Sequence, residues 1–330
     1  MSPQSAWRLN GTTLAILIVL LVGIAGIVYS RVTQAPASPA NGTPGTAGSV
    51  RLAGADAPVL AGTPDAKAQA LLPAGYRFVT PGTLTVATHP AQLPLADYGA
   101  DSRQIIGVEP DIARLVADAL GLKLQLVPAA WADWPLGLES CKYDAVISNI
   151  TVTEARKRKF DFSSYRYDLL GIYTRTDGPL QQIRTPADVV GLKVVVGAST
   201  NQDQILRHWD AQNIAAGLKP VEYQYFDDAV AGRLAVITGR ADVSFEPNAI
   251  SAYSARDGKV RRAGLFPGGW PDSAAISVTT RKGSGLADAI TQALNAQIAS
   301  GTYAQALQRW NLGEEAVAQS QTNPPGLPGF

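Results

Sequence analysis

The chain has 330 residues, of which 46% are hydrophobic and 17% charged, a composition that excludes a disordered protein and leaves room for two compact domains. Its 28 basic and 27 acidic residues give a net charge of +1, so no overall field attracts nucleic acid, and we expect no nucleic-acid partner. The one cysteine, Cys141, permits no intrachain disulfide, and His89 and His208 do not suffice for a metal centre, so we expect neither a metal nor a cofactor.

The segment 1–33 contains a long uncharged apolar run. Arg8 precedes residues 14–29 (LAILIVLLVGIAGIVY), and the next charge is Arg31. This is the pattern of a secretory signal peptide. The uncharged stretch 9–30 also approaches the roughly 20 residues that span a bilayer, so an uncleaved membrane anchor fits as well. Both interpretations remain open, and both predict that the folded part lies outside the cytoplasmic membrane.

The two segments that flank the expected folded part differ from it in composition. Residues 34–77 are crowded with Ala, Pro, Gly, Ser and Thr, which is typical of a flexible linker. Residues 314–330 end in a Pro-rich stretch, and we expect them to form a loose tail.

From residue 83 onward, β-rich segments alternate with helical patterns, which indicates an α/β fold. The first half predicts a helix between Pro110 and Gly121, and strands at 84–88, 122–127, 144–147 and 169–175. After a turn the pattern starts again, with helices at 202–209 and 229–238 and strands at 193–196, 221–225, 241–245 and 274–279. A last helix carries apolar residues at four-residue spacing, namely Leu286, Ile290, Leu294 and Ile298.

Four segments in this order resemble the family 3 extracellular solute-binding proteins, the polar amino-acid receptors of ABC importers. They are GVEPDIARLVADALGLKLQLVPAAW, SCKYDAVISNITVTEARKRKFDFSSYRY, GLKVVVGASTNQ and SGTYAQALQRWNLG. The most specific element is the run 148–153 (SNITVT) followed by Arg156, which is similar to the family's S-G-x-T-x-T-x-x-R. The resemblance covers about residues 83–313.

The resemblance implies a two-lobed periplasmic-binding-protein-like α/β fold, in which two extended strands form a hinge and the lobes close on a ligand. Carried over to this chain, lobe 1 would be residues 78–174 plus 273–313, and lobe 2 would be residues 175–272. The ligand would lie in the cleft between the lobes. We expect a monomer.

The cleft of an amino-acid receptor has to hold a carboxylate and an ammonium group. A carboxylate is best bound by a planar guanidinium with hydroxyl and backbone N–H donors around it. Arg156 is in register with the family's clamp, whereas we interpret 157–159 as solvated charges. Ser148, Asn149 and Thr151 lie where a strand ends, and the family binds ligand there through hydroxyl and main-chain groups.

Lobe 2 would contribute groups from two places. Ser199 and Thr200 follow a strand and precede a helix, where backbone N–H groups bind anions and hydroxyl groups cap the helix. Many family members have an Asp at the position of Pro247, and here the nearest carboxylate is Glu246, one position earlier. Two interpretations of Glu246 remain open: it binds the ammonium group, or it is an exposed carboxylate.

The side-chain pocket departs from the family. The first loop of family members commonly reads T-D-x-x-Y/F-x-P-F, whereas residues 88–95 read THPAQLPL and lack the acid and both aromatic residues. His89 and Gln92 would face the cleft, which favours a ligand with a polar or acidic side chain over a basic one. Trp131 either stacks on the ligand or packs in the core, and both interpretations remain open.

Three functional classes fit these observations. The first is a non-enzymatic, extracytoplasmic binding component of an ABC transporter, which delivers a polar amino acid or related small carboxylate to the membrane permease. The second is an enzyme similar to cyclohexadienyl and arogenate dehydratases, with His89 or Glu246 as the acid–base group. The third is a membrane-anchored ligand sensor. We favour the first class, because the sequence contains no evident catalytic pair.

Overall fold

The computed structural model describes residues 59–99, 103–226 and 228–328. The expected signal peptide or anchor at 1–33 and most of the expected linker lie outside the described residues. Within the described ranges, no helix combines the length and the hydropathy that crossing a membrane requires.

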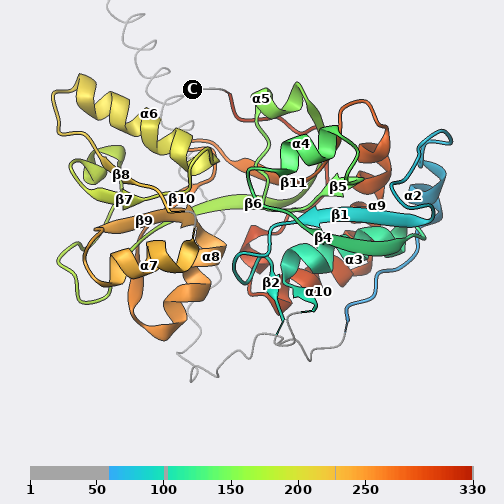
Figure 1. The fold of residues 1–330 in the computed structure, drawn as a ribbon, viewed down its shortest axis with the longest axis horizontal. Helices are drawn as coiled ribbons and strands as arrows, with labels where there is room; N and C mark the ends of the chain where they lie inside the picture. The colour runs from blue at the N-terminus through green and yellow to red at the C-terminus, as the bar shows by residue number, and fades with distance from the viewer. Residues whose placement is uncertain (1–58, 100–102, 227, 329–330) are drawn as a thin grey trace, which may run out of the picture. The chain divides into compact units, whose positions relative to one another are not determined.

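The first part of the described chain contributes three parallel strands to the main sheet, with helices packed on them (Figure 1). In chain order the elements are α2 (Ala66–Ala70), β1 (Thr83–Thr88), β2 (Asp97–Tyr98), β3 (Ile105–Ile106), α3 (Val108–Ala119), β4 (Lys123–Pro128), α4 (Trp134–Glu139), β5 (Ala145–Val146) and α5 (Glu154–Lys157). Strand β1 pairs in parallel with β4 and with β5.

The remaining elements begin with a long strand. They are β6 (Phe160–Arg175), β7 (Lys193–Val195), α6 (Asn201–Ala215), β8 (Glu222–Gln224), α7 (Ala229–Ile237), β9 (Val243–Pro247), α8 (Asn248–Ser254), β10 (Val260–Pro267), β11 (Ala274–Arg281), α9 (Leu286–Ser300) and α10 (Thr302–Arg309). Short 3₁₀ turns occupy Pro186–Val189, Ala255–Asp257 and Gly313–Glu315.

Local sequence accounts for the elements that the pattern predicts. Strand β1 (TLTVAT) is rich in β-branched residues and is buried along its whole length. Helix α3 has Pro110 in its first turn together with acidic Glu109 and Asp111, which favour a helix N-terminus. Gly121 follows its end with a φ of 69°, a conformation that glycine adopts without strain.

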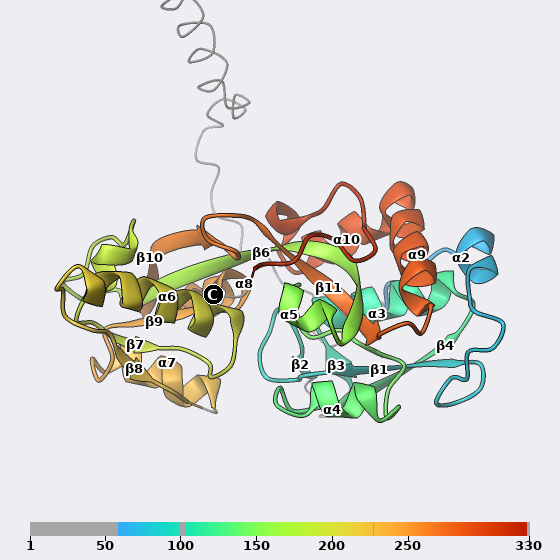
Figure 2. The ribbon, with the colours of Figure 1, turned by 90° about the horizontal axis from the view of Figure 1, so that it is seen from above.

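Strand β6 joins the two halves of the fold. In the described residues the sheet order is β4-β1-β5-β11-β6-β9-β7-β8, with β10 also paired to β6. The first part of β6 pairs with β11, up to Asp168 opposite Ala274, and its last part pairs with β10, from Leu169 opposite Pro267. Figures 1 and 2 show β6 passing from one group of elements into the other. At Asp168 the strand therefore changes its partner.

Separate apolar cores support the two lobes. One core contains Leu84, Ile112 and Leu294, so the start and the end of the folded chain share it. A second is centred on Trp209, whose ring stacks on Phe245 at 5.3 Å between centroids, and two further clusters lie among the described residues. The two-lobed α/β fold is therefore as expected. We propose the lobe boundaries given above on the basis of these cores.

The end of the expected linker is folded rather than flexible. Helix α2 begins at Asp65, whose carboxylate accepts a hydrogen bond of 2.7 Å from the Ala68 backbone. The Thr63 backbone bonds in both directions to the Gln297 side chain, at 2.7 and 3.0 Å. Buried Ala68 and these bonds hold the segment from Thr63 to Ala70 on the first lobe.

The C-terminal segment is also packed, in contrast to the loose tail that its composition indicates. The Ser164 N–H donates to the Gln321 carbonyl at 3.0 Å, and the Leu327 N–H donates to the Val152 carbonyl at 3.0 Å. The side chain of Leu327 is buried. Backbone pairing needs no particular side chain, so it is possible in a Pro-rich segment wherever an N–H is present.

A buried polar network surrounds Arg166 on β6. Its side chain is 1% exposed and donates hydrogen bonds to Glu315 and to Asn149, while Glu109 lies 3.5 Å away. The Tyr165 hydroxyl also donates to Glu109. Burial raises the pKa of both carboxyl groups, and the positive charge of Arg166 opposes that effect. Arg166 thus ties helix α3 and the C-terminal segment to β6.

We predict that Arg166→Met lowers the free energy of unfolding by about 3 to 5 kcal/mol, because it leaves two buried carboxylates without their cation. Lys159→Ala is the matched control, since Lys159 pairs with Glu139 at 3.2 Å on the surface, and it should cost at most about 1 kcal/mol. Urea denaturation measures both. Equal losses would contradict the role assigned to Arg166.

Candidate functional site

The loop after β5 positions the first group of site residues. Asn149 has a φ of 49°, a left-handed conformation that asparagine tolerates better than most residues, and the chain turns there. Its side-chain oxygen accepts from Arg166, so the buried network holds this turn. Ser148 is nearly buried, and its hydroxyl oxygen accepts from the His89 backbone N–H at 3.2 Å. The His89 ring donates from Nδ1 to the Ala129 carbonyl at 3.0 Å.

Thr151 is hydrogen-bonded to two side chains of opposite charge. Its carbonyl oxygen accepts from Arg156 Nη1 at 2.8 Å, and its hydroxyl donates to Asp168 Oδ2 at 2.9 Å. Arg156 and Asp168 attract each other through space, and the described residues contain no direct ion pair between them. Thr151 therefore keeps the Arg156 cation and the Asp168 carboxylate near each other without a direct ion pair.

Arg156 lies against two aromatic rings. Its guanidinium carbon is 5.6 Å from the ring centroid of Trp131 and 6.0 Å from that of Trp134, within the range of cation–π attraction. Burial lowers the pKa of Arg156 to about 10, against the opposing charge of Asp168, so the side chain is still cationic at neutral pH. Among the described residues, the guanidinium makes one hydrogen bond, to Thr151, which leaves most of its five N–H donors for a ligand.

Asp168 is a site residue that the sequence analysis did not identify. It is 3% exposed, and its Oδ1 atom accepts no hydrogen bond in the described part of the chain. Burial raises its pKa to about 6, although Arg166 and the Thr151 hydroxyl oppose that effect. Gly268 packs directly on it, because a Cβ there would lie 2.3 Å from the Asp168 Cβ. The local sequence gave no clear signal, since β6 also carries the acidic residue Asp161.

The start of helix α6 supplies the contribution of the second lobe. Thr200 caps the helix, accepting from the Asp203 N–H at 3.2 Å, and the exposed Ser199 has a φ of 60°. The Ser199 N–H donates to the Asp203 carboxylate at 3.3 Å, so this carboxylate already uses part of the predicted anion site. The next residue, Asn201, is 4% exposed and donates to the Gly268 carbonyl.

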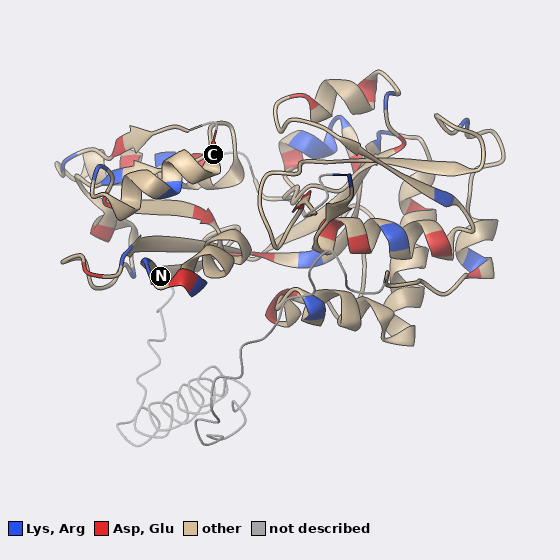
Figure 3. Cartoon of the chain, turned by 60° about the horizontal axis from the view of Figure 1, so that its bottom comes forward, with Lys and Arg blue, Asp and Glu red and all other residues tan. Residues whose placement is uncertain are grey.

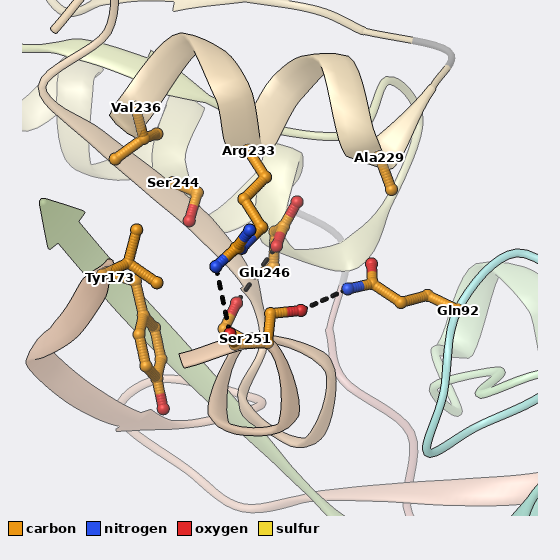
Figure 4. Close-up of a pocket in the computed structure, with 10 residues that line it drawn as sticks. Gln92, Tyr173, Ala229, Arg233, Val236, Ser244, Glu246 and Ser251 are labelled. Carbon is orange, nitrogen blue, oxygen red and sulfur yellow. Dashed lines mark hydrogen bonds between the residues drawn. The ribbon is translucent and has the colours of Figure 1, made fainter. Parts of the chain in front are cut away.

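Gln92 and Glu246 line a different, small cavity (Figure 4). Glu246 is half-buried rather than exposed, accepts from the Ser251 hydroxyl at 3.0 Å and lies close to Arg233. Burial raises the pKa of Glu246, and Arg233 opposes that effect. The Gln92 amide donates to the Ser254 hydroxyl, which links a loop of the first lobe to helix α8. The cavity measures about 10 Å³, which is enough for about one water molecule.

The structure therefore divides the ten predicted site residues into three groups. The first group is Arg156 with its contacts Thr151 and Trp131, together with the adjoining loop residues Ser148, Asn149 and His89. Ser199 and Thr200 lie at the start of α6, while Gln92 and Glu246 line the small cavity. Basic and acidic residues are otherwise intermixed over the described elements (Figure 3), so the charge that attracts a ligand is local.

Comparison with known proteins identifies the family. The sequence pattern of the bacterial extracellular solute-binding proteins, family 3, matches residues 84–314. The chain belongs to this family. The L-cystine-binding protein of Escherichia coli (strain K12) is 32% identical over 162 residues, which are 49% of this chain and 57% of that relative. The chain thus matches little more than half the length of that relative.

Two further comparisons cover more of the fold. The L-cystine-binding protein of Bacillus subtilis (strain 168) is 28% identical over 71% of this chain and 82% of its own length. The solved structure of an ancestral arginine-binding protein bound to arginine has a TM-score of 0.61 and 26% identity, over 69% of this chain and 98% of that one. The fold is therefore that of the periplasmic binding proteins, and the relatives are named for binding amino acids rather than for catalysis.

We predict that Asp168→Asn raises the free energy of unfolding at pH 7 by about 3 kcal/mol and leaves it unchanged near pH 4. The pKa of Asp168 is about 6 in the native state, above its usual 3.8. The native protein therefore binds more protons between these values, and wild-type stability falls as pH rises through that window. Urea denaturation from pH 4 to 7 measures the difference.

Asp161→Asn is the control on the same strand, with the opposite sign. Burial raises the pKa of Asp161, but hydrogen bonds from Lys282 and Gly283 outweigh it and leave this pKa lowered. Its ionised form stabilises the native state above the unfolded pKa, so wild type gains stability as pH rises and the deficit of Asp161→Asn relative to wild type should grow. The assignment for Asp168 is wrong if both variants respond to pH in the same direction.

Proposed function

We propose that this protein is the extracytoplasmic substrate-binding component of an ABC transporter and binds a polar amino acid or related small carboxylate. The observation that carries the proposal is the guanidinium of Arg156, held between Thr151 and two tryptophan rings with most of its donors unused. Membership of the solute-binding family and relatives named for L-cystine and arginine support it. Recovery of the full chain from the soluble cytoplasmic fraction would contradict the location.

The electrostatics of Arg156 favour an anionic ligand. A desolvated cation is unfavourable without an anion, and burial accordingly lowers the pKa of this side chain. A ligand carboxylate can accept two parallel hydrogen bonds from a guanidinium. These bonds replace the hydration that the guanidinium loses on burial. The neighbouring tryptophan rings hold the guanidinium in place by cation–π attraction.

We predict that Arg156→Ala weakens binding by two to four orders of magnitude, or roughly 3 to 5 kcal/mol. Arg156→Lys should recover little, because an ammonium group does not reproduce the two-pronged geometry. Lys157→Ala is the control, since Lys157 pairs with exposed Glu154 at 2.9 Å and should change affinity by less than about threefold.

The measurement begins with a thermal-shift screen of the twenty amino acids and L-cystine against the wild-type protein. Calorimetry with the amino acid that shifts the melting temperature most then gives the affinity of each variant. A folded Arg156→Ala protein that binds this amino acid within a few-fold of wild type would exclude Arg156 as the clamp, and with it the observation that carries the proposed function.

A further inference from the structure

We propose that Asp168, assisted by the side-chain oxygen of Asn201, accepts the ammonium group of an α-amino-acid ligand. This inference rests on the proposed function and makes it more specific: the ligand is a zwitterion bound between Arg156 and Asp168. Asp168 thus replaces Glu246 as the carboxylate that binds the ligand ammonium group.

Two buried acceptors in this region have no donor. The Oδ1 atoms of Asp168 and Asn201 are both buried and accept no hydrogen bond from any described residue. The two residues are both hydrogen-bonded to Gly268, whose N–H donates to the Asp168 carbonyl at 2.8 Å and whose carbonyl accepts from the Asn201 amide. Buried polar atoms are nearly always paired in native proteins, so an unpaired set of acceptors indicates a missing donor.

An ammonium group matches this set of acceptors in charge and in hydrogen bonding. It carries a positive charge and three N–H donors and has no acceptor of its own. The nearby cation Arg166 is already hydrogen-bonded to Glu315 and lies 3.5 Å from Glu109, so two carboxylates compensate its charge. Asp168, by contrast, has the neutral Thr151 hydroxyl as its side-chain partner.

Arg156 lies near Asp168 and carries the opposite charge. An α-amino acid carries its carboxylate and its ammonium on the same carbon atom, so its receptor needs a cation and an anion a short distance apart. Thr151 provides that spacing, because its carbonyl holds Arg156 and its hydroxyl holds Asp168. A direct ion pair would neutralise both groups, whereas two charges held apart leave room for the zwitterion between them.

The alternative acceptor, Glu246, has partners of its own and little space. Ser251 donates to it, Arg233 lies beside it, and the cavity that it lines measures about 10 Å³. The carbon skeleton of an amino acid does not fit there. Asp168, in contrast, has a buried oxygen without a donor and lies where β6 changes its partner from β11 to β10.

The test compares Asp168→Asn with the matched variant Glu246→Gln, using the full chain and calorimetry. The first probe is the amino acid that binds wild type most tightly among the twenty amino acids and L-cystine. The second probe is the same molecule without its α-amino group, for example glutaramate where the first is L-glutamine. Comparing the two probes isolates the interaction with the ammonium group, as a double-mutant cycle does.

We expect Asp168→Asn to weaken binding of the amino acid by about 30-fold or more and to change binding of the des-amino probe by less than about threefold. Glu246→Gln should bind both probes as wild type does. Asn201→Ala should show a smaller loss, about three- to tenfold, again for the amino acid alone.

The possible failures are distinguishable. If wild type and Glu246→Gln bind the amino acid and Asp168→Asn binds it equally well, the assignment of Asp168 is overturned while the proposed function stands. Equal losses for both probes would assign Asp168 a structural role and overturn the inference as well. A wild-type protein that binds none of the amino acids overturns both this inference and the amino-acid assignment in the proposed function.

Discussion

The continuous strand β6 is the constraint on which the rest of the structure depends. It runs for 16 residues, pairs with β11 in one lobe and with β9 and β10 in the other, and so links both halves through a single stretch of backbone. Arg166 and Asp168 lie next to the position where its partner changes. Since both flanks of the strand are hydrogen-bonded there, these side chains are held in a rigid frame, and the loop that contains Thr151 is built against them.

Two of the charged residues of β6, Arg166 and Asp168, are buried with different consequences. Arg166 is surrounded by the carboxylates of Glu109 and Glu315 and by the Asn149 amide, and this arrangement stabilises the fold. Asp168 is equally buried but lacks a partner for one oxygen, so burial raises its pKa. Such unfavourable electrostatics are typical of functional sites, which give up stability that a ligand restores on binding.

Burial shifts the two site charges in opposite directions. The pKa of Arg156 is lowered and that of Asp168 is raised, which means that each charged form is less favourable in the protein than in water. Because Thr151 keeps the two groups from neutralising each other, both shifts persist in the protein without ligand. A zwitterion would relieve both at once, and that gives the site a reason to prefer amino acids over simple carboxylates.

Sequence alone was sufficient for the α/β pattern and for Arg156, because periodicity and a motif are local properties. It was insufficient to predict Asp168 as a site residue, because the burial of Asp168 depends on contact with Gly268, a residue 100 positions away. The packed segment near Thr63 was also missed, since its composition is that of a linker and its partner, Gln297, lies on the last long helix. The role of Glu246 on β9 was left open for the same reason, because Arg233 lies close to it from helix α7.

The most direct test is a crystal structure of the protein with the amino acid that binds it most tightly. We predict that the ligand carboxylate lies within about 3 Å of the Arg156 guanidinium nitrogens, and that the ammonium nitrogen lies within about 3 Å of Asp168 Oδ1. A bound amino acid whose ammonium group contacts Glu246 instead, or whose carboxylate does not contact Arg156, would contradict it.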